Sequence, residues 1–165
     1  MVGREVEKGT MTTQTTITEP VRSRRRSRVA ALTAVVALGV ALLVGACNPE
    51  AYRTSDYINY SRAQNGLPTL EFNMMLAMKA QAWTGVMANN GSLSHSDLAA
   101  DNWGQWQKLG ENVGYGWSVE SVHQAFMDSA PHRANILDPA FNKVGTGVYR
   151  DPSGKYWVVH EFMLE

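Results

Sequence analysis

The spacing of apolar residues predicts helices through much of the chain after residue 55. Residues 73–89 carry the clearest helical pattern, because four apolar side chains fall on one face: Leu76, Ala80, Trp83 and Met87. Residues 56–63 and 119–129 are shorter segments of the same type, and residues 131–137 are typical of a short helical turn. Residues 91–117 show no regular period and predict a loop-rich middle.

Polar and small residues mark the ends of these helices. Asn73 and Ser118 stand where a side-chain oxygen can accept hydrogen bonds from the first turn. An Asn-Gly pair follows each of the first two helices, and such pairs commonly end helices. The short turn begins with Pro131, whose fixed φ suits a first helical position.

The end of the chain changes to a strand-like pattern. The segments "KVGTGVYR" (143–150) and "KYWVVHEFM" (155–163) are rich in β-branched and aromatic residues, and "DPSG" (151–154) lies between them. Proline in the second position and glycine in the fourth fit a type I turn, so we expect a β-hairpin. Helices followed by a hairpin predict the α+β class, with helices packed on a small antiparallel sheet.

An apolar segment near the N-terminus predicts a leader or a membrane anchor. The basic run "RSRRRSR" (22–28) precedes a segment, 29–47, that has no charge and ends at Cys47. This order is typical of a secretory signal. The ending "VGAC" resembles the lipobox of bacterial lipoproteins, in which the cysteine is lipidated and becomes the mature N-terminus. The segment also approaches the length of a bilayer-spanning helix, so an uncleaved anchor is the alternative.

Both alternatives give the same organisation: a polar, basic region 1–28, a signal peptide or anchor 29–47, and a domain 52–165. The arginines stay inside, so the domain lies outside the cytoplasm and the membrane is its expected partner. Cys47 is the only cysteine, so the domain has no disulfide and depends on its core. Residues 1–21 are polar and threonine-rich and are left out of the expected fold; Met11 is an alternative start to Met1.

Charge argues against a nucleic-acid partner. The net charge is zero, with +4 on residues 1–28 and −4 on the remainder. Phosphate binding needs lysines and arginines clustered on the folded domain, whereas here they cluster before the apolar segment.

Four histidines and one glutamate are the candidate functional residues. His123 lies on an expected helix, where we expect a surface or boundary position, and His160 lies on an expected strand, where we expect a supporting hydrogen bond. His95 and His132 lie where packing does not demand histidine. Glu111, in "GENVGYGW", either braces its own backbone or points to a histidine. Spacing alone does not favour a metal site, because there is no pair of histidines four residues apart.

Six motifs occur in the order found in the CAP superfamily of cysteine-rich secretory proteins, antigen 5 and pathogenesis-related proteins: "NYSRAQNGLPTL" (59–70), "LSH" (93–95), "GENVG" (110–114), "SAPHRANIL" (129–137), "VGTGVY" (144–149) and "YWVVHEF" (156–162). Together they cover nearly all of 52–165, and the chain most resembles the bacterial secreted members.

The resemblance implies an α–β–α sandwich with a three-stranded antiparallel sheet between helical layers. It also implies a cleft lined by His95, Glu111 and His132, where some members bind zinc. Two histidines and a glutamate with an open position suit zinc. Ser129 stands where animal members have a second glutamate, so Glu111 is expected to be the principal carboxylate of the cleft.

Three functions follow from these residues. The first is a membrane-tethered module that binds a lipid, an envelope component or a protein and has no enzyme activity. Its surface aromatics would be Trp103, Trp106, Tyr115 and Trp117, unless these pack in the core. The second is a zinc-dependent hydrolase in which His95 and His132 bind the metal and Glu111 acts as base or ligand. The third is a purely structural hydrogen-bonded network.

Overall fold

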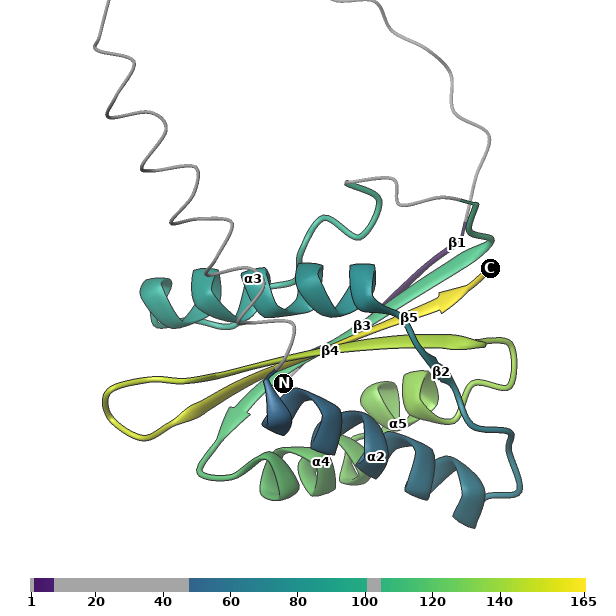
Figure 1. Ribbon diagram of the computed structural model, residues 1–165, viewed down its shortest axis with the longest axis horizontal. Helices are drawn as coiled ribbons and strands as arrows, with labels where there is room; N and C mark the ends of the chain where they lie inside the picture. Colours follow the sequence, from purple (N-terminus) through teal and green to yellow (C-terminus); the bar gives the residue numbers. More distant parts are fainter. Residues whose placement is uncertain (1, 8–47, 101–104) are drawn as a thin grey trace, which may run out of the picture.

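The computed structural model describes residues 2–7, 48–100 and 105–165, which form a five-stranded sheet covered by helices on both faces (Figure 1). In chain order the described elements are β1 (Val2–Glu7), α2 (Pro49–Gln64), β2 (Glu71–Phe72), α3 (Met74–Asn90), β3 (Lys108–Gly116), α4 (Val119–Asp128), α5 (Ala130–Ile136), β4 (Lys143–Arg150) and β5 (Tyr156–Leu164). The predicted segment 29–47 lies outside the described residues. None of the helices within the described ranges combines the length and the apolar character that a membrane span requires.

The strand order is β1-β3-β5-β4-β2. The central strand β5 pairs antiparallel with β3 and β4, β1 pairs antiparallel with the outer edge of β3, and β2 pairs parallel with β4. Helix α3 covers one face of this sheet, and α2, α4 and α5 cover the other (Figure 1). The predicted α–β–α sandwich is therefore confirmed.

Two expectations about the sheet were wrong. The sheet has five strands instead of three, because β1 and the two-residue β2 extend it. Strand β3 lies within the segment predicted as loop-rich. Its three glycines interrupt the alternation of apolar and polar side chains that would indicate a strand. Its nine residues pair along their whole length with β5, so the neighbouring strand determines its conformation. Residues 2–7, left out of the expected fold, belong to the sheet.

The predicted helices are present, and their caps are as expected. The Asn73 side chain accepts from the backbone of Met75 and Leu76, and Ser118 caps α4. Gly91 ends α3 in a left-handed conformation. The first helix is longer than predicted: it begins at Pro49, seven residues before the predicted start. Asn48 caps it and Pro49 fits the first turn.

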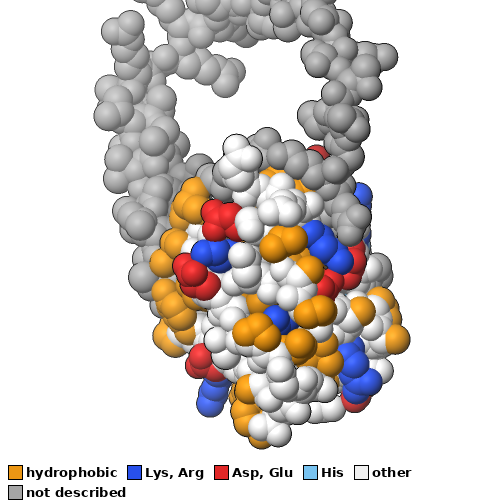
Figure 2. Space-filling model, turned by 90° about the vertical axis from the view of Figure 1, so that its right-hand side faces the viewer, with side chains coloured by type: hydrophobic (Ala, Val, Ile, Leu, Met, Phe, Trp, Pro, Cys, Tyr) orange, Lys and Arg blue, Asp and Glu red, His pale blue; other side chains and the backbone are white. Residues whose placement is uncertain are grey.

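Side chains alternate between the two helical layers along each strand. In β5, Trp157 and Val159 pack with α3, whereas Val158 and Phe162 belong to the core cluster with α2, α4 and α5. The end of the molecule seen in Figure 2 mixes acidic, basic and apolar side chains without a large region of one charge. This two-sided core positions the candidate site, because neighbouring strand residues point to opposite helical layers.

Candidate functional site

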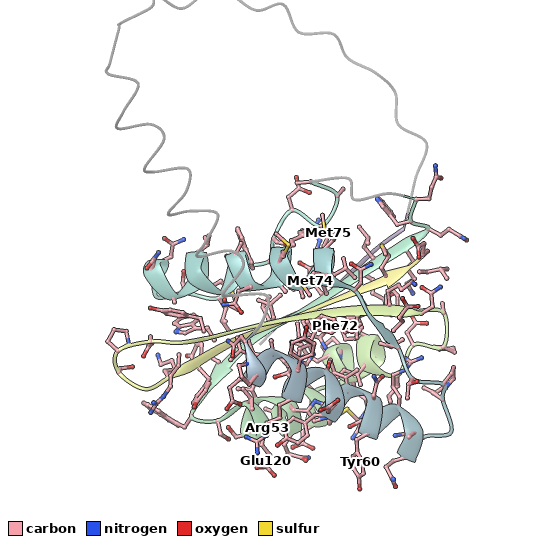
Figure 3. All side chains as sticks on the ribbon, in the orientation of Figure 1. Arg53, Tyr60, Phe72, Met74, Met75 and Glu120 are labelled. Atoms are coloured by element: carbon pink, nitrogen blue, oxygen red, sulfur yellow. The ribbon has the colours of Figure 1, made fainter. Side chains whose placement is uncertain are left out.

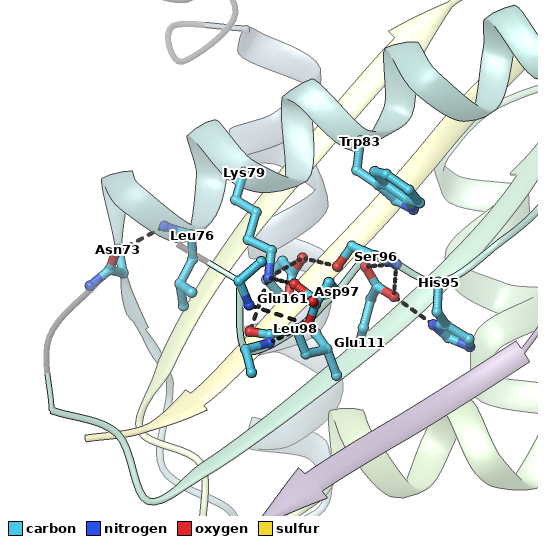
Figure 4. Close-up of polar contacts among 12 residues, drawn as sticks. Asn73, Leu76, Lys79, Trp83, His95, Ser96, Asp97, Leu98, Glu111 and Glu161 are labelled. Atoms are coloured by element: carbon cyan, nitrogen blue, oxygen red, sulfur yellow. Dashed lines mark hydrogen bonds and ion pairs between the residues drawn. The ribbon is translucent and has the colours of Figure 1, made fainter. Parts of the chain in front are cut away.

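Glu111 is enclosed on the α3 face of the sheet. Its carboxylate accepts from the backbone N–H of Ser96 at 3.0 Å and lies 2.5 Å from His95 Nδ1 (Figure 4). Its side chain is fully buried, while 14% of the His95 side chain is exposed. The loop after α3 is held by Trp83, whose indole N–H donates to the Ser94 carbonyl at 2.8 Å. Glu111 therefore fixes this loop on the sheet and orients His95.

A second buried carboxylate lies beside Glu111. Glu161 is its direct partner across the β3–β5 pairing and is 1% exposed. Its Oε1 is 3.3 Å from Ser96 Oγ, which donates to it, and 3.9 Å from Lys79 Nζ (Figure 4). Burial, followed by the charge of Glu111, raises the pKa of Glu161 well above its usual range. Glu161 can thus stay protonated and donate to Glu111, so the two acids share one enclosed network.

The cationic end of this network comes from α3. Lys79 Nζ donates to the carbonyls of Asp97 at 2.9 Å and Leu98 at 3.1 Å, in addition to its approach to Glu161. Lys79 thereby joins the helix, the loop that carries His95, and the sheet. Sequence reasoning missed Lys79 and Glu161. Strand alternation could have identified Glu161, because it shares the inward face of β5 with Trp157 and Val159.

His132 lies on the opposite face of the sheet. It is fully buried, its Nδ1 is 2.7 Å from Ser129 Oγ, and its ring is 4.9 Å from that of Phe126 on α4. Asn112, one residue after Glu111, points to this side and donates to the His132 carbonyl at 3.0 Å. Ser129, which stands where a glutamate was considered, therefore orients His132. The sheet brings Glu111 together with His95 and leaves His132 on the other side.

Asn135 ties α5 to the edge of the sheet. Its amide donates to the Asn112 side chain at 2.9 Å and to the Glu111 carbonyl at 3.2 Å. Both asparagines are buried, so these bonds satisfy polar groups that water cannot reach. The motifs "GENVG" and "HRAN" are therefore connected in space through amides, which sequence reasoning did not assign.

The arrangement of His95, Glu111 and His132 does not match the zinc site that was predicted for them. Zinc needs three or four ligands about 2.0–2.3 Å away. No group of three or more His, Cys, Asp or Glu side chains within the described ranges lies close enough to hold a metal ion. The Glu111 carboxylate already binds the Ser96 N–H and His95, and His132 lies across the sheet. Zinc binding therefore stays a prediction, which a metal titration of the protein can test.

The other two histidines are more buried than expected. His160 is fully buried and packs edge-on against Phe126, with ring centroids 4.8 Å apart. His123 is 8% exposed, is 2.8 Å from Ser61 Oγ through Nε2, and stacks on Tyr57. Burial lowers the pKa of His123 to about 4, and burial together with His123 and His132 lowers that of His160 well below its usual range. Both are therefore neutral at pH 7.

We expect His123 to make the protein acid-sensitive. Its pKa is about 4 when folded and 6.5 as the ordinary value, so the unfolded chain binds more protons between these values. Folding stability then falls as the pH drops below 6.5, by about 2 kcal/mol for this group at pH 4.5. Urea unfolding at pH 7 and pH 4.5 should show a smaller acid loss for His123→Gln than for the wild type.

Two other buried groups also contribute to the pH dependence of folding stability. His160 acts in the same direction, whereas the raised pKa of Glu161 acts oppositely, because its folded carboxyl holds a proton that the unfolded one releases. Both are present in the wild type and in His123→Gln. The substitution also removes one cause of the low His160 pKa, which reduces the acid loss of the variant further. Equal acid losses in the two proteins would contradict the assignment of His123.

A groove runs between α2 and α4, on the side of the molecule away from the sheet. Its volume is about 610 Å³. It is lined by Asp56, Tyr57, Tyr60, Ser61, Gln64, Asn65, Glu120, His123, Gln124, Met127 and Arg133. Tyr60 projects from α2 away from the sheet, and Glu120 lies at the same outer edge (Figure 3). Sequence reasoning did not predict this groove, because it depends on the packing of two helices about 60 residues apart.

The predicted surface aromatics divide between core and surface. Trp117 is 72% exposed and Tyr115 is 44% exposed, near the end of β3. Trp106 is partly buried against the cluster around Leu98 and Leu109. Trp103 lies outside the described residues. Among the described residues of this set, Tyr115 and Trp117 at the end of β3 are the exposed ones.

Comparison with known proteins agrees with this architecture. The family model of the cysteine-rich secretory protein family, CAP, matches residues 55–162. The protein YkwD of Bacillus subtilis (strain 168), itself uncharacterized, is 30% identical over 108 residues, which are 60% of this chain and 41% of YkwD. The chain thus spans less than half the length of this curated relative.

Solved structures give the same fold at low sequence identity. An outer surface protein from Borrelia burgdorferi matches with a TM-score of 0.63 and 16% identity over 70% of this chain and 92% of its own. An extracellular SCP-domain protein from Bacillus anthracis matches with a TM-score of 0.61 and 23% identity over 72% of this chain and 41% of its own.

Proposed function

The chain belongs to the cysteine-rich secretory protein (CAP) family, and we propose that it is a non-enzymatic module that binds a lipid acyl chain outside the cytoplasm. The observation that carries the proposal is the groove between α2 and α4. At about 610 Å³ it falls within the range of small-molecule sites, about 300–1,000 Å³.

The lining of the groove suits an amphipathic ligand. Apolar surface comes from the rings of Tyr57 and Tyr60 and the thioether of Met127. Tyr60 is 66% exposed, so its ring is accessible to a ligand in the groove. Arg133 lies on the rim, where a guanidinium would pair with a carboxylate or phosphate head.

The polar network beneath α3 supports binding over catalysis. A general base must reach a substrate proton within about 2.6–3.2 Å, directly or through one water. With β1 on the edge of β3, Glu111 and Glu161 are enclosed and hydrogen-bonded to the protein, and His132 is fully buried across the sheet. The network accordingly has a structural role, because it holds the loop that carries His95. The proposal thus combines a binding module with a structural hydrogen-bonded network.

A tether at Cys47 would direct one end of the domain toward the membrane. Asn48 donates to the Val148 carbonyl at 2.7 Å, so the chain enters the domain beside the second half of β4. Tyr149 follows directly and is 38% exposed, and Tyr115 and Trp117 lie at the same end of the sheet as the β4–β5 hairpin. Tyrosine and tryptophan are the side chains that favour a membrane interface.

Titration of a fluorescent fatty acid tests the proposed function. We expect saturable binding by the wild type and a weakening of about tenfold for Tyr60→Ala, because the substitution removes aromatic contact worth about 1.4 kcal/mol. Tyr149→Ala is the matched control, since it removes an exposed tyrosine away from the groove. Arg133→Glu should also weaken binding, with Arg53→Glu as its control. Absence of saturable binding, or equal effects of Tyr60→Ala and Tyr149→Ala, would contradict the proposal.

A further inference from the structure

The outer edge of β3 holds a short strand that is remote in sequence. Six residues of β1 pair antiparallel with β3, from Val2 opposite Val113 to Glu7 opposite Lys108. About 100 residues separate the two strands in the sequence. An edge strand presents unpaired backbone N–H and C=O groups, which is the general basis for binding an extended peptide. β1 therefore shows how such a peptide fits this edge.

The edge selects a glycine at one position. Gly3 lies opposite Asn112 and is pressed against the start of α5. A Cβ added there would lie 2.9 Å from the carbonyl carbon and oxygen of Pro131 and 3.2 Å from the His132 nitrogen. Because these are backbone atoms of a helix, a side chain does not fit without moving α5.

The same edge selects an acid two residues later. Glu5 lies 2.7 Å from Lys108 Nζ, which is also 2.7 Å from Asp138. Hydrogen bonds to Asp138 and Glu5 raise the pKa of Lys108, so its ammonium group stays protonated at neutral pH. Between the two selected residues, the Arg4 carbonyl accepts from Asn135 at 3.3 Å. The β3 edge therefore favours a segment with a glycine, then any residue, then an acidic residue.

The strand also lies along the candidate site. Arg4 pairs with Glu111, whose side chain reaches His95, and Gly3 packs on the backbone of His132. A peptide on this edge consequently lies against both the "GENVG" and the "SAPHRANIL" motifs. This surface is distinct from the groove between α2 and α4.

The predicted leader separates β1 from the domain after export. If residues 29–47 are a signal peptide or an anchor, residues 2–7 and the domain end on opposite sides of the membrane, or residues 2–7 are removed. The exported domain then presents the β3 edge without β1. We propose that this edge is a peptide-binding groove, which takes an extended Gly-x-Glu or Gly-x-Asp segment of a second protein as an antiparallel strand.

A labelled hexapeptide, VGREVE, tests the proposal against the full chain in mild detergent. Gly3→Val should displace the chain's own strand, and fluorescence anisotropy should then show peptide binding. The wild type should bind at least about tenfold more weakly, because its own strand competes at high effective concentration. The peptides VVREVE and VGRKVE are controls that lose the glycine or the acid, and both should bind Gly3→Val weakly.

Hydrogen exchange gives a second readout. Exchange of the β3 backbone amides should be faster in Gly3→Val than in the wild type and slow again when VGREVE is added. Glu5→Lys is a second displaced variant, since it places a lysine beside Lys108. The proposal is overturned if VGREVE binds neither variant, or if the three peptides bind alike. Fatty-acid binding should be unchanged in both variants, so failure here is distinguishable from failure of the proposed lipid function.

Discussion

Replacing Arg62 with methionine should lower the free energy of unfolding by about 4 kcal/mol. Arg62 is fully buried on α2 and donates to the carbonyls of Pro68 at 2.8 Å, Ile136 at 2.9 Å and Asp138 at 2.8 Å. Methionine retains much of the packing volume but leaves these buried acceptors unpaired, at about 1–3 kcal/mol each and not fully additive. Urea unfolding monitored by tryptophan fluorescence measures the loss.

Arg53→Met is the matched control for Arg62. Arg53 lies on the same helix, its side chain is 62% exposed, and its ion pair with Glu50 spans 3.8 Å. Exposed pairs of this kind contribute little, so we expect a change below about 0.5 kcal/mol. Comparable losses in the two variants would show that Arg62 does not hold α2 to the segment after α5.

Replacing Gly147 with alanine should cost about 3 kcal/mol or more, because α3 lies directly on β4. A Cβ on Gly147 would be 2.3 Å from the Ala80 carbonyl carbon and 2.4 Å from its oxygen. Real contacts of this kind do not occur, so the helix must move. Because α3 carries Lys79 and Trp83, its movement should also loosen the loop that presents His95. Differential scanning calorimetry and hydrogen exchange of residues 92–98 test both consequences.

Gly85→Ala is the control for Gly147→Ala. Gly85 lies within α3, and a Cβ there meets open space. Alanine should stabilise this helix by about 0.5–1 kcal/mol through its higher helix propensity. The prediction for Gly147 fails if the two alanine variants have similar melting temperatures.

Local patterns predicted the elements that depend on local interactions. The helix after Asn73 and the strands on either side of "DPSG" follow from side-chain spacing and turn chemistry. β3 and β1 were missed because their pairing is non-local and made by backbone groups, which leave little trace in a glycine-rich or polar sequence. The family resemblance supplied the layered fold, which local pattern alone did not determine.

The candidate site was predicted only in part for the same reason. The Glu111–His95 pair was expected, but its second acid comes from β5, and the pairing register that places Glu161 beside Glu111 is not visible in sequence. His132 was expected in the same cluster, but the alternation of β3 directs Asn112, and not Glu111, toward it. Strand register therefore determines which motif meets which partner.

The most direct test of the proposed lipid function is a crystal structure of the protein with a brominated fatty acid. We predict that the anomalous signal of bromine lies in the groove between α2 and α4, beside Tyr57, Tyr60 and Met127, with the head group near Arg133. Bromine located only at other surfaces, or no ordered bromine at a concentration that saturates the fluorescent titration, would contradict the assignment of the groove.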